Sequence, residues 1–130
     1  MSAPHLRAGK LGEQIAERWL QRKGLQTIRK NYRCKVGELD LIMLENNRLV
    51  IVEVRYRKST DFGGPLNSVS TLKQQRIART TLHFLQAAPQ FKHSPLRFDV
   101  LSLVGSLDKP AIEWCQRAFD MDCLGWSTST

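Results

Sequence analysis

The sequence predicts an α/β fold, with a mixed central sheet of about five strands flanked by helices. Two observations support this prediction. Apolar residues recur at helical spacing in one segment near the start of the chain and in one in its second half, and segments typical of strands lie between and after them. The predicted order is helix, three strands, helix, two strands, and helices interspersed among strands favour a sheet covered by helices.

The length of 130 residues fits one compact domain, which we expect over residues 1–122, with residues 123–130 as a flexible tail. Twenty Lys and Arg residues against 12 Asp and Glu residues give a net charge of +8. Such a charge favours polyanionic partners, with nucleic acid first and an anionic membrane surface second.

The three cysteines lack the spacing of a disulfide framework or a zinc site, so we expect reduced thiols in a cytoplasmic protein. The first residues contain no apolar core typical of a signal peptide. No window reaches the roughly 18 consecutive apolar residues of a membrane-spanning helix. Secretion and membrane insertion are therefore not expected.

The first helix is predicted from about Arg7 to Lys23, where apolar residues recur at helical spacing, and Gly24 then supplies a left-handed stop. Glu13 lies at the border of the buried side of this helix. It either points inward along a seam or is an ordinary boundary glutamate.

Residues 25–35 alternate between apolar and polar positions and predict a first strand that leads into a basic loop. The two strands of residues 37–58 follow, and then a Gly/Pro/Ser-rich loop over residues 59–68. The basic side chains of the first strand and its loop are Arg29, Lys30, Arg33 and Lys35.

The second helix is predicted to begin at Thr71, which has capping-box spacing to Gln74, and to end at Pro89. Lys73 and Gln74 fall in its first turn, and Gln74 lies on the apolar side, where a polar side chain needs a partner. Residues 96–104 and 111–119 predict the last two strands.

Residues 37–58 predict a hairpin whose turn residues are Asn46 and Asn47, because Asn tolerates the positive φ of primed turns. This turn fixes the register, and direct cross-strand partners share a face. The pairs are Leu44 with Leu49, Ile42 with Ile51, Asp40 with Glu53, and Glu38 with Arg55. The opposite face carries Leu39, Leu41, Met43, Val50, Val52, Val54 and Tyr56.

The charged end of this hairpin is its informative part. Glu38 opposite Arg55 reads as a cross-strand salt bridge. Asp40 opposite Glu53 places two repelling carboxylates on a half-buried face, which favours protonation of one of them or a cation between them. The sequence thus predicts a divalent metal, and the alternative is a structural arrangement in which Arg55 or Arg57 neutralises the pair.

Carboxylate ligands without nearby His or Cys suit Mg²⁺ or Mn²⁺, which accept substrate phosphate oxygens as further ligands. Basic segments flank the carboxylates at residues 29–35 and 55–58, the second of which includes Arg57 and Lys58. They would bind a nucleic-acid backbone while the metal activates water, so the site resembles one that hydrolyses phosphodiesters.

Asp40 followed by Glu53-Val54-Arg55 also resembles the motif of the restriction-endonuclease-like, or PD-(D/E)XK, nucleases. More specifically, the chain resembles the YraN-type family of uncharacterised nuclease-like proteins, which is similar to archaeal Holliday-junction resolvases. The resemblance covers residues 9–119. The matching segments are LGEQIAERWL, NYRCKVGELDLIM, IVEVRYR, FGGP, LKQQRI and RFDVLSLV.

The resemblance implies a restriction-endonuclease-like fold in which Asp40 and Glu53 bind the metal, with the Val54 carbonyl as a further ligand. It implies that Glu13 reaches the site as the resolvase glutamate does and that Glu38 is a second-shell or alternative ligand. The start of the second helix, with Lys73 and Gln74, borders the site in related folds.

The departure from the motif is Arg55, where these nucleases usually carry Lys, because arginine stays charged and cannot act as a base. Arg55 can still position water and stabilise charge, and Lys73 is a candidate for the missing amine. Three hypotheses follow: an endonuclease acting on DNA, a non-catalytic nucleic-acid-binding module of the same fold, and an adaptor for acidic proteins. A homodimer is compatible with the first, since a resolvase cuts two strands.

Overall fold

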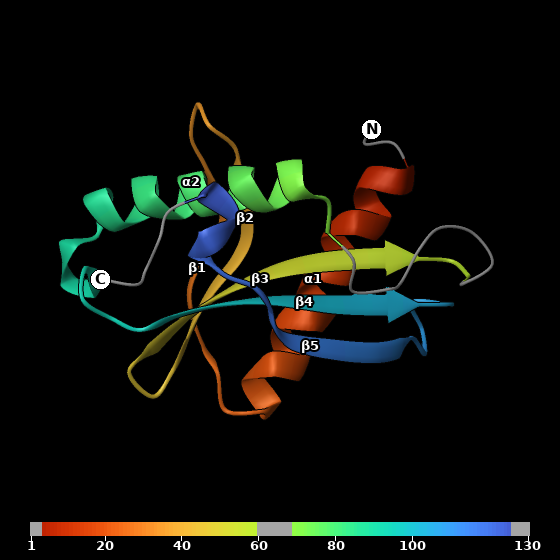
Figure 1. Ribbon diagram of the computed structural model, residues 1–130. Coiled ribbons are helices and arrows are strands. Elements are labelled where there is room, and N and C mark those ends of the chain that lie inside the picture. The colour runs from red at the N-terminus through yellow and green to blue at the C-terminus, as the bar shows by residue number, and fades with distance from the viewer. Residues whose placement is uncertain (1–3, 60–68, 126–130) are drawn as a thin grey trace.

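The computed structural model describes residues 4–59 and 69–125 and confirms the predicted α/β architecture (Figure 1). A five-stranded sheet has the order β1-β2-β3-β4-β5, with α1 and α2 on its two sides. The helices are α1 (Pro4–Arg22) and α2 (Thr71–Ala87), and short 3-10 turns are η1 (Pro89–Phe91) and η2 (Met121–Leu124). The strands are β1 (Gln26–Arg33), β2 (Glu38–Glu45), β3 (Arg48–Arg57), β4 (Leu96–Val104) and β5 (Ala111–Phe119).

The sheet is mixed because β3 and β4 pair in parallel, whereas the other neighbours pair antiparallel. A parallel pair needs a crossover connection, and α2 lies in it. The predicted loop over residues 59–68 falls in this connection, and residues 60–68 lie outside the described part of the chain. The last two strands have the predicted bounds.

Helix α1 begins at Pro4, three residues before the predicted start, and ends through the predicted glycine stop. Gly24 adopts φ 100°, and its N–H donates to the Gln21 carbonyl while the Leu25 N–H donates to the Leu20 carbonyl. This pair of bonds is a Schellman motif, and Leu20 and Leu25 are both buried. The stop turns the chain directly into β1.

Two hydrophobic clusters hold the helices to the two faces of the sheet. The cluster on the α1 side contains Ala16, Leu20, Leu25, Leu41, Met43, Val50, Val52, Leu101 and Leu103. The cluster on the α2 side contains Tyr32, Leu39, Ile42, Leu49, Ile51, Ile77, Phe84, Ala88 and Phe98. Leu39 is a correction, because strict alternation placed it with Leu41 and Met43 on the opposite face. The regular pattern of β2 therefore breaks between Leu39 and Leu41.

The β2–β3 hairpin has the predicted turn, and Asn46 adopts φ 57°. Its pairing runs from Glu45 with Arg48 to Leu41 with Val52, in the predicted register. Asp40 and Glu53 occupy the next positions along the two strands. The end of this pairing is where the candidate site begins.

The start of α2 differs from the capping box that the sequence predicted. The N-cap is Ser70, not Thr71, and its hydroxyl accepts the Lys73 N–H at 3.2 Å. Gln74 finds the partner that its apolar surroundings require, because its side-chain Nε2 donates to the Val69 carbonyl at 2.8 Å. The first turn of α2 is thereby fixed at both its cap and its buried side.

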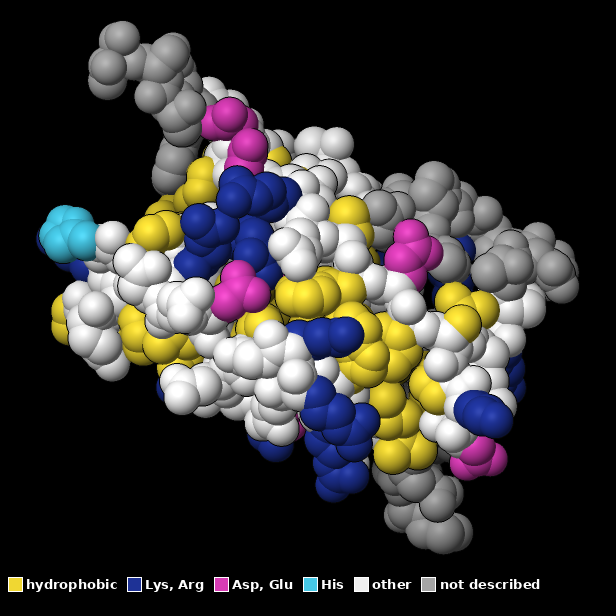
Figure 2. Space-filling view, turned by 90° about the horizontal axis from the view of Figure 1, so that it is seen from below, with side chains coloured by type: hydrophobic (Ala, Val, Ile, Leu, Met, Phe, Trp, Pro, Cys, Tyr) yellow, Lys and Arg dark blue, Asp and Glu magenta, His cyan; other side chains and the backbone are white. Residues whose placement is uncertain are grey.

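The end of the chain is held to α2 as far as the structure describes it. The turn η2 reaches into the segment predicted as a tail, and Gln75 Nε2 on α2 donates to the Cys123 carbonyl at 3.0 Å. Residues 126–130 lie outside the described part. The surface seen from below carries several separate groups of Lys and Arg beside hydrophobic side chains (Figure 2), so the basic side chains on this face do not form one continuous patch.

Candidate active site

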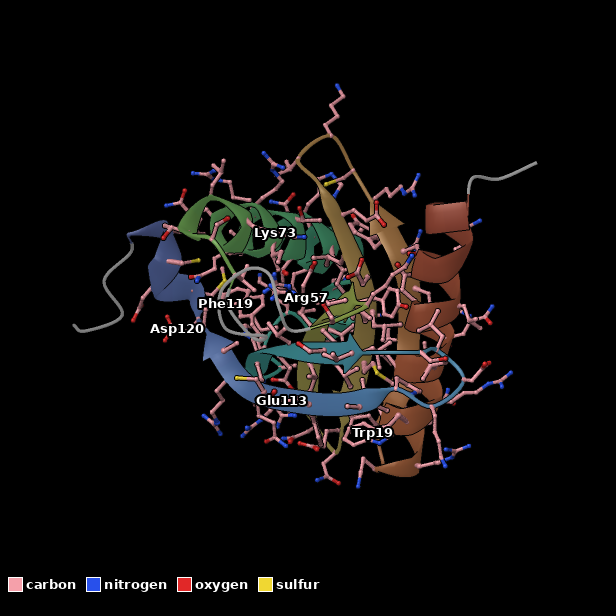
Figure 3. All side chains as sticks on the ribbon, turned by 90° about the vertical axis from the view of Figure 1, so that its right-hand side faces the viewer. Trp19, Arg57, Lys73, Glu113, Phe119 and Asp120 are labelled. Atoms are coloured by element: carbon pink, nitrogen blue, oxygen red, sulfur yellow. The ribbon has the colours of Figure 1, made fainter. Side chains whose placement is uncertain are left out.

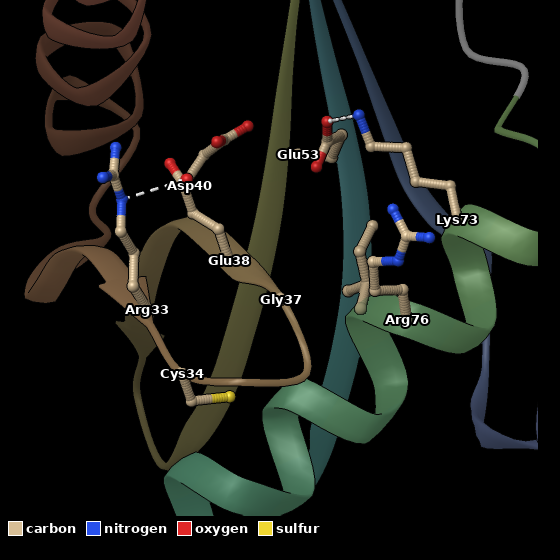
Figure 4. Close-up of a pocket in the computed structure, with 9 residues that line it drawn as sticks. Arg33, Cys34, Gly37, Glu38, Asp40, Glu53, Lys73 and Arg76 are labelled. Carbon is tan, nitrogen blue, oxygen red and sulfur yellow. Dashed lines mark ion pairs between the residues drawn. The ribbon is translucent and has the colours of Figure 1, made fainter.

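A pocket of about 550 Å³ opens between the diverging ends of β2 and β3 and the first half of α2. Figure 4 shows acidic side chains from the strands facing basic side chains from β1 and α2 across it. The lining residues are Arg33, Cys34, Gly37, Glu38, Asp40, Glu53, Lys73, Arg76 and Ile77. Five of the positions predicted for the site therefore line one cavity: Arg33, Glu38, Asp40, Glu53 and Lys73.

Asp40 lies where the β2–β3 pairing stops. Its Oδ2 accepts the backbone N–H of Val54 at 2.9 Å, so a side chain takes the place of the next backbone acceptor of the ladder. This contact was not predicted from the sequence, because the predicted register continued the strand pairing through Asp40 and Glu53. The hydrogen bond fixes the position of the carboxylate beside the backbone of β3.

The environment of Asp40 disfavours its charge. Burial, followed by the charges of Glu53 and Glu13, raises its pKa from 3.8 to about 7. The hydrogen bond from Val54 and the charge of Lys73 act in the opposite direction but do not compensate. A cation that binds beside Asp40 would therefore stabilise the ionised form of this carboxylate.

Glu13 of α1 faces the same carboxylates. One oxygen from each of Glu13, Glu38 and Asp40 can be chosen so that all three lie within 4.8 Å of one another. Burial and then the charge of Glu38 raise the pKa of Glu13, and a hydrogen bond with Asn31 opposes this rise. Of the two interpretations of Glu13, this geometry agrees with a side chain that points inward and not with an ordinary boundary glutamate.

Glu53 is only 8% exposed and forms an ion pair with Lys73, whose Nζ lies 2.7 Å from Oε1 (Figure 4). Its charge raises the pKa of both Asp40 and Glu13, so it belongs to the same electrostatic cluster. The three gathered oxygens, however, come from Glu13, Glu38 and Asp40, whereas the sequence predicted Asp40 and Glu53 as the principal pair.

The partner of Glu38 is a correction. The sequence placed Arg55 opposite it, whereas the structure pairs it with Arg33 of β1, whose Nε lies 3.1 Å from its carboxylate. The reason is that β1 runs antiparallel beside β2 with Arg33 and Glu38 as direct partners. Arg55 lies on β3, in a smaller cavity of about 220 Å³ that it shares with Glu53 and Lys73.

The predicted basic residues divide into those that reach the pocket and those that do not line it. Arg33 lines it, whereas Arg29 lies over the Tyr32 ring and Lys30 pairs with Glu17. The remaining positions are exposed or partly exposed outside the lining: Lys35 in the β1–β2 turn, Arg57 at the end of β3, and Lys58 after it.

Two lining residues, Arg76 and Gly37, were missed by sequence reasoning. Arg76 lies one turn after Lys73 on α2, and its three-residue spacing from Lys73 was the available signal. Gly37 lets the β1–β2 turn touch α2, because a Cβ there would lie 2.8 Å from Arg76 Cγ and 2.9 Å from Thr80 Oγ1. That close approach could not be read from the sequence.

Residues 12–103 match the model of the family described as "Uncharacterised protein family UPF0102". The chain belongs to the UPF0102 family. A UPF0102 protein of Pseudomonas fluorescens is 43% identical over 116 residues, covering 89% of this chain and 95% of its own length. One from Pseudomonas putida is 44% identical over 121 residues, covering 92% and 98%.

A UPF0102 protein of Legionella pneumophila is 43% identical over 115 residues, which cover 88% of this chain and 96% of its own. The span matched by the UPF0102 model, residues 12–103, includes every residue that lines the pocket, and Glu13 as well. Over the described residues, no helix combines the length and apolar character needed to cross a membrane.

Proposed function

We propose that this UPF0102 protein is a metal-dependent endonuclease that hydrolyses phosphodiester bonds in DNA. The observation that carries the proposal is the Asp40 carboxylate, whose pKa is raised to about 7 by burial and by neighbouring carboxylates inside a pocket with basic side chains. A carboxylate whose pKa is strongly shifted by burial and by neighbouring charges inside a pocket is a candidate functional group. The resemblance to PD-(D/E)XK nucleases supports the same reaction class.

The donor set fits a hard divalent cation. Glu13, Glu38 and Asp40 offer carboxylate oxygens within 4.8 Å of one another, and Glu53 adds negative charge beside them. All-oxygen ligands suit Mg²⁺ or Mn²⁺. When bound, such an ion would lower the pKa of a water and neutralise charge that develops on the phosphoryl group.

The protein itself supplies orientation and counter-charge for the phosphodiester. Arg33, Lys73 and Arg76 surround the carboxylates, and side chains of this kind hold phosphate oxygens. Hydrolysis consumes one water: its oxygen forms a bond to phosphorus while the bridging P–O bond breaks. The leaving oxygen takes a proton, so the products are a phosphate monoester and a hydroxyl end.

A second candidate is a non-catalytic nucleic-acid-binding module that retains the nuclease fold. The position of Arg55 favours it, because the residue that stands for the motif lysine lines the smaller cavity and is absent from the lining of the Asp40 pocket. Such a module would bind nucleic acid in a salt-dependent manner without cutting it.

Cleavage of labelled linear, junction and flap DNA in Mg²⁺ or Mn²⁺ tests the proposal. Junctions and flaps are included because of the similarity to resolvases. We expect cleavage by the wild type, and losses of at least about 100-fold in Asp40→Asn and Glu53→Gln, which remove charge that the reaction uses. Asp108→Asn is the matched control, since Asp108 is exposed in the β4–β5 turn.

Cleavage by Asp40→Asn at the wild-type rate would reject this site. DNA binding by the wild type without cleavage of any substrate would favour the non-catalytic module. The salt dependence of that binding, measured by fluorescence anisotropy, then counts the phosphate contacts.

A further inference from the structure

Lys73 is held at the edge of the carboxylate cluster by the first turn of α2. Its backbone N–H is capped by Ser70, and the neighbouring Gln74 is fixed to the Val69 carbonyl. The side chain remains 55% exposed, and its Nζ lies 2.7 Å from Glu53 Oε1. Two hydrogen bonds thus hold the first turn of the helix, while the Lys73 side chain stays accessible from solvent.

Lys73 and Glu53 lie between two cavities. Both residues line the larger pocket, which contains Asp40, and both line the smaller one, which contains Arg55, Val69 and Ser70. Arg55 lines only the smaller cavity. Of Lys73 and Arg55, the side chain that lines the Asp40 pocket is therefore the lysine of α2 and not the arginine of β3.

The chemistry of the two side chains agrees with this arrangement. A lysine is a compact charge on a flexible stem with three donors, so it can exchange one oxygen partner for another by rotation of its own bonds. Its present partner, Glu53, belongs to the same cluster as Asp40. Any second cation that binds the cluster competes with the ammonium for this carboxylate.

We propose that Lys73, rather than Arg55, acts together with Arg33 and Arg76 as a cationic side chain of the Asp40 pocket. It is the counter-ion of Glu53 in the metal-free protein, and it turns to a phosphate oxygen of bound DNA when a divalent ion neutralises the cluster. The inference rests on the proposed function for its second half. In this role Lys73 supplies charge and hydrogen bonds and transfers no proton.

Two measurements on the full chain test the inference. The first is the affinity for Mn²⁺ by titration calorimetry. We expect Lys73→Met to bind Mn²⁺ about three- to tenfold more tightly, because the competing ammonium is removed and like charges no longer repel. Lys109→Met is the matched control, since Lys109 is exposed in the β4–β5 turn, and its affinity should equal that of the wild type.

The second measurement is single-turnover cleavage at saturating Mn²⁺. We expect Lys73→Met to lose at least about 100-fold in rate, as removal of one transition-state donor does elsewhere, and Lys73→Arg to recover part of it. Arg55→Met should lose less than Lys73→Met. If Lys73→Met does not fold, Lys73→Gln replaces it, because an amide still donates to Glu53.

The outcomes separate this inference from the proposed function. Full cleavage by Lys73→Met together with loss in Arg55→Met would overturn the inference and return the role to the strand arginine. If the wild type cuts no substrate, the proposed function fails, and the Mn²⁺ affinity alone tests whether Lys73 is the counter-ion of Glu53. An unchanged Mn²⁺ affinity in Lys73→Met would overturn that role too.

Discussion

Two buried or partly buried aspartates in the same sheet have opposite environments. Asp99 of β4 is 0% exposed, and its carboxylate accepts hydrogen bonds from the Arg97 guanidinium, the Trp114 indole and the Arg117 backbone. The distances from donor nitrogen to oxygen are 2.9 Å for Arg97 Nε, 3.0 Å for Arg97 Nη2, 2.9 Å for Trp114 Nε1 and 3.1 Å for Arg117 N. Asp40 has one hydrogen bond from Val54, and three other carboxylates share its surroundings.

The difference separates a carboxylate with a structural role from one that we propose to be functional. Around Asp99, the bulge of β5 at Arg117, with φ 56°, brings a backbone N–H onto the buried charge, and Glu45 satisfies the far side of Arg97. The buried Asp99 carboxylate therefore has both a cationic partner and neutral hydrogen-bond donors. Around Asp40, the β2–β3 pairing ends and carboxylates gather, so binding of a proton or a further cation is favoured there.

The largest expected effect is on stability and concerns the buried ion pair of Arg97 with Asp99. Arg97→Met would leave the Asp99 carboxylate buried without its bidentate partner, and the loss of one member of a buried pair costs about 3–5 kcal/mol. We expect a fall of this size in the free energy of unfolding, measured by denaturant titration followed by circular dichroism. Lys109→Met is the matched control on an exposed site.

A fall of less than about 1 kcal/mol in the free energy of unfolding of Arg97→Met would be comparable to the loss of an exposed ion pair. It would contradict the contrast drawn between Asp99 and Asp40. It would mean that the charge of Asp99 is balanced by the Trp114 and Arg117 donors alone.

The second effect concerns Asp40 and has the opposite sign from that of an ordinary carboxylate. Its pKa is raised in the folded protein to about 7 from 3.8, so the native state binds more protons than the unfolded state between these values. The contribution of Asp40 to the free energy of unfolding of the metal-free protein should therefore be fully present below about pH 4 and fall by about 2–4 kcal/mol as pH rises through 7. Glu13, whose pKa is also raised, adds to the same trend.

Denaturant titrations across this pH range, in a chelator, measure the fall. Asp40→Asn should flatten the profile, because an amide does not titrate, and Asp108→Asn should leave it unchanged. Stability of the wild type that rises between pH 4 and 7 would show that Asp40 is compensated in the same way as Asp99.

The sequence predicted what depends on local pattern. The Asn46-Asn47 turn fixed the hairpin register, and the strand-like segments on either side of the GSLDKP turn gave the bounds of the strands at residues 96–104 and 111–119. It also brought Asp40 and Glu53 together across the hairpin. These features follow from the chemistry of residues that are close in the chain. Lys73 became a candidate through the family resemblance.

What the sequence did not predict depends on where the strands part and which elements touch. Alternation assumes that a ladder continues, so the contact of Asp40 with the Val54 N–H and the position of Leu39 were outside its reach. The ion pair of Glu38 with Arg33 depends on the register of β1 against β2, which contains a bulge between Thr27 and Arg29. No turn residue encodes that register.

The smallest expected effect tests how α2 is placed against the pocket. Gly37→Ala would put a Cβ 2.8 Å from Arg76 Cγ and 2.9 Å from Thr80 Oγ1, closer than such contacts normally allow. Arg76 can yield because it is long and exposed, but Thr80 is buried and its hydroxyl is held by the Arg76 carbonyl at 2.7 Å. We therefore expect a loss of about 1–2 kcal/mol in the free energy of unfolding.

The same substitution at Gly9 is the matched control, because a Cβ there meets nothing within 4 Å and alanine favours a helix over glycine. Gly9→Ala should be neutral or stabilising by up to about 1 kcal/mol. Since Arg76 and Lys73 share one helix, a shift of α2 in Gly37→Ala would also loosen the pairing of Lys73 with Glu53, and Mn²⁺ affinity should rise toward that of Lys73→Met. An unchanged affinity combined with lower stability would show that the β1–β2 turn yields instead, and that α2 is held by its own packing against the sheet.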